Sequence, residues 1–135
     1  MQVLLVDDNP LMQQVISRFL MSQGYQVGVA PSGKEALALV RREGCQLLVI
    51  DMRLPDQDGP DLLLALRREP GLERCPAIAV SGLGEDDRER TVAAGFDAFL
   101  AKPIDLDELS AAVQRFVGAP GQRLDGGPAL RVVGA

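Results

Sequence analysis

The stretch Leu47-Leu48-Val49-Ile50-Asp51 places four aliphatic residues directly before one carboxylate. Three further apolar runs end on polar residues: residues 3–6 before Asp7-Asp8, residues 77–80 before Ser81, and residues 98–101 before Lys102. Such uniformly apolar runs are typical of strands that are buried on both faces of a parallel sheet. Because open parallel sheets form their sites beyond the carboxyl ends of strands, we expect three carboxylates, a hydroxyl and an ammonium to gather at one sheet edge.

The composition limits the classes of protein that this chain can represent. At 135 residues with 47% hydrophobic content, it is long enough for one domain with its own core. The 14 basic and 19 acidic residues give a net charge of −5, so we expect no direct nucleic-acid partner. No apolar stretch approaches the roughly 20 residues that cross a bilayer, which predicts a cytoplasmic chain without membrane insertion.

Strand-like and helix-like segments alternate five times along the chain. Apolar residues from Leu11 to Leu20 recur at helical spacing, Gly24 suits the end of that helix, and Ser32 suits the start of the next. Other expected elements are strands over 26–30 and 97–101 and helices over 62–68, over 86–94, and from 105 or 106 to 117. This alternation predicts an α/β fold with a parallel sheet and helices on both faces. The Gly/Pro-rich segment 118–135 is expected to be a linker or tail after a domain over 1–117.

The polar residues at the strand ends together resemble the receiver domain of two-component response regulators. The resemblance covers about residues 2–117 and rests on five elements in order: Asp7-Asp8, Asp51, Pro55 with Asp58-Gly59, Ser81, and Lys102-Pro103. It implies a doubly wound, flavodoxin-like sheet of five parallel strands in the order 2-1-3-4-5. It also implies phosphorylation of Asp51 by a histidine kinase or a histidine phosphotransfer domain, in a signalling phosphoprotein that is not an enzyme toward other substrates.

The resemblance also implies a Mg²⁺ site and a switch. Asp8, one oxygen of Asp51 and the backbone carbonyl of Met52 would bind Mg²⁺ directly, and Asp7 would bind it through water. A carboxylate is a weak nucleophile toward phosphorus unless the phosphoryl charge is neutralised, which a hard divalent cation can do. Lys102 adds a compact positive charge, and the Ser81 hydroxyl can donate to a phosphoryl oxygen.

The switch that the resemblance implies consists of Ser81 and Phe99. A phosphoryl dianion would draw Ser81 inward and let the Phe99 ring fill the vacated space. The face made by the fourth helix, the fifth strand and the fifth helix would then change. The fourth helix, over 86–94, offers mainly Val92, Ala93 and Ala94 for packing, so we expect it to be weakly held and movable. Gly82 predicts a mobile loop after the switch hydroxyl.

The first helix offers a candidate docking surface. At 3.6 residues per turn its apolar positions cover about half of the circumference, which is wider than one core-facing stripe of about 100°. We therefore expect Leu11 and Val15 to be partly exposed, beside Pro103 and Ile104, where a helix carrying phosphohistidine could bind. The last helix lacks the regularly spaced arginines that receivers joined to winged-helix DNA-binding domains often use for dimerisation, so the resemblance implies a monomer or weak dimer.

Other interpretations of the same residues exist, and some of them lack a residue that they need. Asp7 and Asp8 could simply favour the start of the first helix, with Asp8 or Asn9 as its N-cap. A haloacid-dehalogenase-type phosphatase needs a second acid where Arg53 stands, and a flavodoxin-like cofactor binder needs a phosphate loop where the two acids stand. A non-phosphorylated receiver that acts as a docking module is the alternative function. A stand-alone regulator and a receiver within a longer protein, such as a hybrid histidine kinase, are both compatible with the sequence.

Cys45 and Cys75 are the only cysteines, and the chain has no histidine. A disulfide framework and a Cys/His zinc site are therefore excluded. The two cysteines precede Asp51 and Ser81 by equal distances, which places both at the opposite edge of the sheet on neighbouring strands. We expect two free thiols that lie close together and have no catalytic role.

Overall fold

Five strands and five helices alternate in the part of the chain that the computed structural model describes, residues 1–82 and 85–119. The expected tail over 118–135 and the expected mobile loop after Gly82 lie largely outside these residues. The elements are β1 Val3–Val6, α1 Pro10–Ser22, β2 Val27–Ala30, α2 Gly33–Glu43, β3 Leu47–Asp51, α3 Gly59–Leu66, β4 Ala77–Ser81, α4 Glu85–Ala94, β5 Ala98–Ala101 and α5 Leu106–Val117. None of the helices among the described residues has the length and apolar character to span a membrane.

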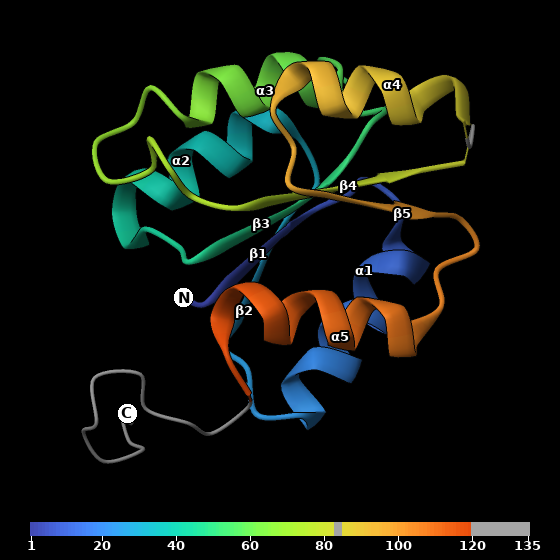
Figure 1. Ribbon diagram of the computed structural model, residues 1–135. Helices are drawn as coiled ribbons and strands as arrows, with labels where there is room; N and C mark the ends of the chain where they lie inside the picture. The colour runs from blue at the N-terminus through green and yellow to red at the C-terminus, as the bar shows by residue number, and fades with distance from the viewer. Residues whose placement is uncertain (83–84, 120–135) are drawn as a thin grey trace.

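The strands form one parallel sheet in the order β2-β1-β3-β4-β5, which confirms the predicted fold (Figure 1). In the register of the sheet, Val6 pairs with Ile50 of β3 and with Ala30 of β2. Asp51 pairs with Val80 at the end of β4. All five strands therefore end at the same edge, and the residues that follow them share one end of the molecule.

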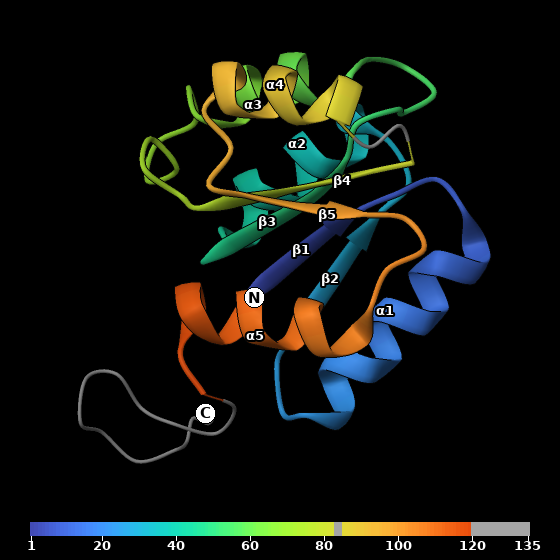
Figure 2. The ribbon, with the colours of Figure 1, turned by 45° about the vertical axis from the view of Figure 1, so that its right-hand side comes forward.

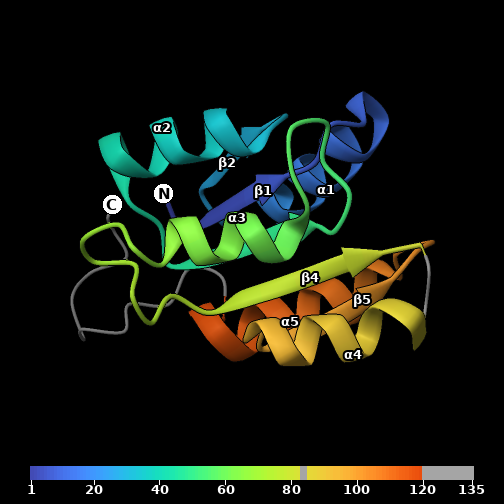
Figure 3. The same ribbon diagram turned by 90° about the horizontal axis from the view of Figure 1, so that it is seen from above.

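Alternating side chains of the sheet bury two separate apolar layers. In β1, Leu4 and Val6 pack with α2 and α3, whereas Val3 and Leu5 pack with α1 and α5. Helices α2, α3 and α4 lie on one side of the sheet, and α1 and α5 lie on the other (Figures 1 and 2). Seen from above, α2 lies near β2 and α4 near the opposite end of the sheet, beside β5 (Figure 3). Every central strand is thus covered on both faces, as its continuous apolar sequence predicts.

The boundaries of several elements differ from the sequence prediction by a few residues. The strands predicted to begin at 26 and 97 begin at Val27 and Ala98. The helix predicted over 62–68 is α3, Gly59–Leu66, because a proline is tolerated in the first turn and the helix can begin before it. Ser32 is the N-cap of α2, as predicted. Asn9, one of the two candidates, is the N-cap of α1 and accepts from two backbone N–H groups.

The packing of α4 differs from the prediction. Val92 is 71% exposed and Ala93 is exposed, whereas Ala94 is partly buried and packs against the core layer under α2 and α3. Among residues 87–94, the part of this helix whose side chains the structure describes, Asp87 and Thr91 are buried. These two residues are four apart, so they share the helix face that is turned inward. The apolar packing expected from Val92 and Ala93 is therefore wrong, because polar contacts hold this face of α4.

The two cysteines are free and lie next to each other, as predicted. Their Sγ atoms are 4.0 Å apart, just before the starts of β3 and β4. This position is at the sheet edge opposite to the strand ends that carry Asp51 and Ser81. The thiols therefore lie apart from the candidate site.

Candidate functional site

The predicted site residues come together at the carboxyl ends of the strands. Asp51 and Ser81 are the last residues of β3 and β4, Asp7 follows β1, and Lys102 follows β5. The backbone N–H of Lys102 donates to the Ser81 carbonyl over 2.8 Å, which fixes the two chain segments side by side. The parallel topology thus assembles residues that are up to 95 positions apart in the sequence, the separation of Asp7 and Lys102.

Three carboxylates form a cluster that could hold a cation. Asp7, Asp8 and Asp51 each offer an oxygen, and these oxygens all lie within 4.8 Å of one another. Asp7 and Asp51 are buried, at 1% and 6% exposed, whereas Asp8 is exposed. Buried carboxylates side by side are unfavourable without a compensating positive charge. A donor set made only of oxygens fits a hard divalent cation such as Mg²⁺.

The backbone around Met52 shapes one side of this cluster. The N–H of Gly59 donates to the Met52 carbonyl over 3.0 Å, and a carbonyl oxygen has a second lone pair for another partner. A Cβ on Gly59 would lie 3.0 Å from the Cα of Met52, so a larger residue there would need the backbone to shift by a small distance. Met52 itself is fully buried, and its side chain packs in the core layer under α2 and α3.

Both oxygens of Asp51 have partners in the protein. The Lys102 ammonium donates to Oδ2 over 2.9 Å, and the backbone N–H of Arg53 donates to Oδ1 over 3.0 Å. The Lys102 side chain is 30% exposed, and that of Asp51 is 7% exposed. The carboxylate is therefore oriented by two donors and stays open to solvent only at the strand edge.

The charges of the cluster shift two pKa values. Burial raises the pKa of the Asp7 carboxyl, the Asn9 backbone N–H partly offsets this, and the charge of Asp51 raises it further. Burial alone would lower the pKa of Lys102. The hydrogen bond and charge of Asp51, with the charges of Asp7 and Asp8, outweigh it, so the pKa of Lys102 is raised. Lys102 is thus a firmly charged ammonium within an acidic cluster.

The switch residues lie beside this cluster, but Ser81 has a partner that the sequence analysis missed. The Ser81 hydroxyl donates to Oδ2 of Asp87 in α4. Phe99 is partly buried, and the Arg88 guanidinium of α4 lies 4.9 Å from the centre of its ring. An acid in the first turn of a helix is ordinarily solvated, so no sequence signal singles out Asp87.

The predicted docking residues lie at the same end of the molecule. Leu11 and Val15 of α1 are 67% and 41% exposed, which confirms the expected exposure of this helix edge. Pro103, which follows Lys102 through a cis peptide bond, is exposed. Ile104 is partly buried and packs against the core layer under α1 and α5. Most of this surface is therefore accessible, although part of Ile104 belongs to the core.

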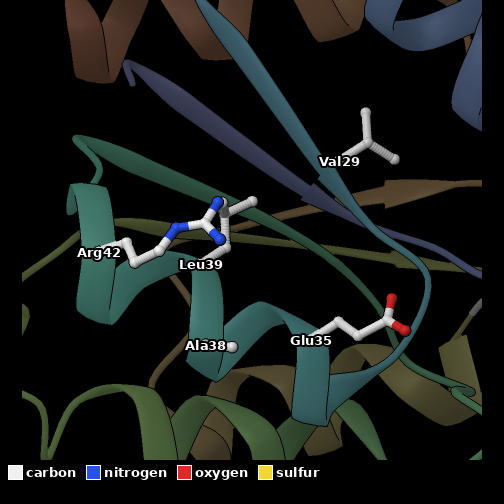
Figure 4. Close-up of a pocket in the computed structure, with 5 residues that line it drawn as sticks. All are labelled: Val29, Glu35, Ala38, Leu39 and Arg42. Atoms are coloured by element: carbon white, nitrogen blue, oxygen red, sulfur yellow. The ribbon is translucent and has the colours of Figure 1, made fainter.

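A separate shallow pocket of about 240 Å³ lies between β2 and α2 (Figure 4). Val29 comes from β2, and the other lining residues come from α2: Glu35, Ala38, Leu39 and Arg42. None of these residues belongs to the acidic cluster or its surroundings. This pocket is therefore not part of the candidate site at the strand ends.

Known proteins are similar to this chain in sequence. The family model for the response regulator receiver domain matches residues 3–114. An uncharacterized 14.6 kDa protein encoded in the sodA1 3′ region of Leptolyngbya boryana is 40% identical over 117 residues, which are 86% of this chain and 89% of that protein. The transcriptional regulatory protein GlrR of Escherichia coli K12 is 34% identical over 113 residues, which cover 82% of this chain but only 25% of GlrR.

A solved structure resembles the chain in both fold and sequence. The receiver domain of the sensor histidine kinase PA1611 from Pseudomonas aeruginosa PAO1 gives a TM-score of 0.79 at 35% identity, over 87% of this chain and 98% of that domain. The crystal structure of that domain has a magnesium ion coordinated in its active site cleft. From the matched residues 3–114, the strand order and these relatives, we conclude that this chain belongs to the response regulator receiver domain family of two-component systems.

Proposed function

We propose that Asp51 accepts a phosphoryl group from a phosphohistidine on a histidine kinase or a histidine phosphotransfer domain. One observation carries this proposal: the buried Asp51 carboxylate is fixed by the Lys102 ammonium at 2.9 Å and shares a three-carboxylate cluster. These groups are the ones that the chemistry needs, so a receiver that only docks is not favoured.

In the proposed step, a carboxylate oxygen of Asp51 attacks phosphorus and forms an acyl phosphate. The bond from phosphorus to the donor imidazole nitrogen breaks, and that nitrogen keeps the electron pair. Lys102 balances the charge on the phosphoryl oxygens, and positioning with electrostatic stabilisation supplies most of the catalysis. Transfer to Asp51 and later loss from it are the only reactions that we assign to the chain.

We propose that Asp7, Asp8, Asp51 and the Met52 carbonyl hold Mg²⁺ for this reaction. All four offer oxygens, which are hard donors that fit this cation. The oxygens of the three carboxylates lie within 4.8 Å of one another and need a positive charge beside them. When bound, Mg²⁺ would neutralise charge on the phosphoryl oxygens. In this proposal Asp7, the most buried of the three acids, contacts the cation through water, as the family resemblance implies.

We propose that phosphorylation is read through Ser81 and Phe99. Both residues border α4, because Ser81 binds Asp87 and Phe99 lies against Arg88. A phosphoryl group that recruits the Ser81 hydroxyl would change the contacts of α4, and with them the face formed by α4, β5 and α5. The output partner would bind to this face.

We propose that the phosphohistidine donor docks beside the acidic cluster on Leu11, Val15, Pro103 and Ile104. Leu11 and Val15 are large apolar side chains exposed to 67% and 41%, which is the kind of surface that a partner helix can cover. In this proposal, residues 1–117 act as the receiver unit in the cytoplasm, as a monomer or weak dimer and without nucleic-acid contact.

Acetyl phosphate, a small phosphoryl donor, tests the proposed function without a partner protein. Intact-mass spectrometry after incubation with Mg²⁺ should show one added phosphoryl group. The label should be lost in Asp51→Asn and in the presence of a chelator. Persistent labelling of Asp51→Asn would show that another residue is the acceptor.

A further inference from the structure

We infer that Asp87 is a positioning residue that holds the Ser81 hydroxyl away from the phosphoryl site until Asp51 is phosphorylated. This inference rests on the proposed function, because it concerns how that site is regulated. The Ser81 hydroxyl lies at the end of β4 and donates to Oδ2 of Asp87 in the first turn of α4. The contact joins the candidate switch directly to the helix that the switch would move.

The Asp87 carboxylate is buried and fully engaged. It is 1% exposed, and its second oxygen accepts from Arg53 over 3.1 Å and from Arg90 over 3.3 Å. A buried charge is stable only when it is paired and hydrogen-bonded, so these three donors keep Asp87 in place. Asp87 is therefore part of an ordered network and not a solvated acid at the start of a helix.

The same network reaches the phosphoacceptor loop. The Arg53 side chain binds Asp87, while the Arg53 backbone N–H donates to Asp51. Arg90 binds Asp58 over 3.2 Å as well as Asp87. Because Arg53 and Asp58 face each other across a β-bridge, the segment after Asp51 is tied to α4 at two points, Asp87 and Arg90.

Phosphorylation and Asp87 would compete for the same hydroxyl hydrogen. A serine hydroxyl carries one hydrogen and can donate it to one strong acceptor at a time. When Ser81 donates to a phosphoryl oxygen, Asp87 loses that donor, and α4 loses one of the contacts that fix its first turn. The Asp87 contact therefore favours the unphosphorylated state, and removing it should favour the phosphorylated state.

A purely structural role for Asp87 gives a different expectation. An acid in the first turn of a helix that pairs with two arginines stabilises the helix whether or not Ser81 is present. The inferred role requires that the effect of Asp87 on the phosphoryl site disappears when Ser81 has no hydroxyl. A double-mutant cycle between the two residues separates these roles.

The test uses beryllofluoride with Mg²⁺ as a phosphoryl mimic, with its affinity measured by ¹⁹F NMR. Asp87→Ala should bind it at least about fivefold more tightly than the wild type, the lower end of ordinary coupling between sites. In the Ser81→Ala background, Asp87→Ala should change the affinity less than twofold. The matched control, Asp107→Asn, removes a first-turn acid from α5 outside the network and should leave the affinity unchanged.

Each outcome decides between the proposals. If the wild type does not bind beryllofluoride, the proposed function fails and this inference fails with it. If the wild type binds but Asp87→Ala gives no gain, or gives the same gain without the Ser81 hydroxyl, only the role of Asp87 is refuted. The side chains of Arg53 and Arg90 are 46% and 44% exposed, so water can solvate them in Asp87→Ala and the variant should fold.

A measurement on the unmutated chain covers the case in which Asp87→Ala does not fold. The carboxyl ¹³C resonance of Asp87 should shift when beryllofluoride and Mg²⁺ bind, because the hydroxyl donor leaves. The shift should be absent in Ser81→Ala. An unchanged Asp87 resonance in the wild type, at saturating beryllofluoride, would contradict the inference.

Discussion

At the scale of single residues, the pairing of Asp51 with Lys102 organises the site. Their contact of 2.9 Å joins the ends of β3 and β5, which are separated by β4 in the sheet. A flexible lysine can follow a charge that moves from the carboxylate to a phosphoryl group, because its ammonium has three rotatable donors. Lys102 can therefore serve both the resting state and the phosphorylated state.

Replacing Lys102 with glutamine should slow labelling by acetyl phosphate by about 10²-fold, the usual effect of removing one donor from a developing negative charge. The measurement is the rate of phosphoryl incorporation by intact-mass spectrometry at saturating Mg²⁺. Lys34→Gln is the matched control, because Lys34 is exposed in the first turn of α2 and is not among the charges that shift the pKa of Asp7. Equal labelling rates for both variants would show that Lys102 takes no part in the phosphoryl transfer.

The exposed apolar residues of α1 allow a second test at this scale. Leu11→Glu and Val15→Glu should slow transfer from the cognate phosphohistidine protein by at least about tenfold, since a charge replaces an apolar contact in the complex. Rates are taken relative to labelling by acetyl phosphate, which needs no docking. Met21→Glu, at an exposed apolar position near the other end of α1, is the control and should transfer normally. Normal transfer by Leu11→Glu and Val15→Glu would place the donor elsewhere.

At the scale of elements, α2 is capped by a residue from a different part of the chain. Asp56, in the loop between β3 and α3, accepts from the backbone N–H groups of Gly33 and Lys34, each over 3.0 Å. N–H groups at the start of a helix have no acceptor within the helix, so Asp56 supplies one from another element. The hydrogen bond from the Gly33 N–H is the main reason why the pKa of Asp56 is below its ordinary value, and the hydrogen bond from the Lys34 N–H lowers it further.

The Asp56 cap predicts a stability effect that depends on pH. Asp56→Ala should lower the free energy of unfolding by about 1 kcal/mol at neutral pH, a typical value for loss of a helix cap. Because the folded-state pKa is lowered, this contribution is present above the unfolded pKa and is lost as the pH falls through the folded pKa. Urea denaturation followed by circular dichroism measures both effects.

The control for the cap is Asp61→Ala, which removes an exposed acid from the first turn of α3. It should have a smaller effect at neutral pH, because among residues 1–82 and 85–119 no hydrogen bond or ion pair joins the Asp61 side chain to another element. The difference in free energy of unfolding between wild type and Asp56→Ala should shrink at acid pH. If it stays constant from neutral to strongly acid pH, Asp56 does not act as an ionised cap.

The elements also show how far the sequence predicts this structure. The strand ends that carry Asp51 and Ser81 were predictable, because continuous apolar runs mark strands buried on both faces. The contacts of α4 were not, since a helix with few apolar residues gives no periodic signal for the face that turns inward. Asp56 and Asp87 were missed for the same reason: their partners lie on other elements, and only the folded chain brings them together.

At the scale of the whole molecule, the residues that form the core and the residues of the candidate site lie in different parts of the parallel sheet. The two apolar layers fill the space between the sheet and its helices, and the acids, Ser81 and Lys102 collect at the carboxyl end. The Lys102 ammonium offsets part of the mutual repulsion among Asp7, Asp8 and Asp51. A phosphoryl group on Asp51 would act where the chain already concentrates its charge.

The most direct test of this account identifies the modified residue itself. After phosphorylation with acetyl phosphate and Mg²⁺, borohydride reduces an acyl phosphate of aspartate to homoserine, and peptide mass spectrometry then locates the change. The account predicts homoserine at position 51 alone, with none in a sample treated with chelator. Two results would contradict it: a labelled protein in which Asp51 is unaltered, or homoserine at any other position.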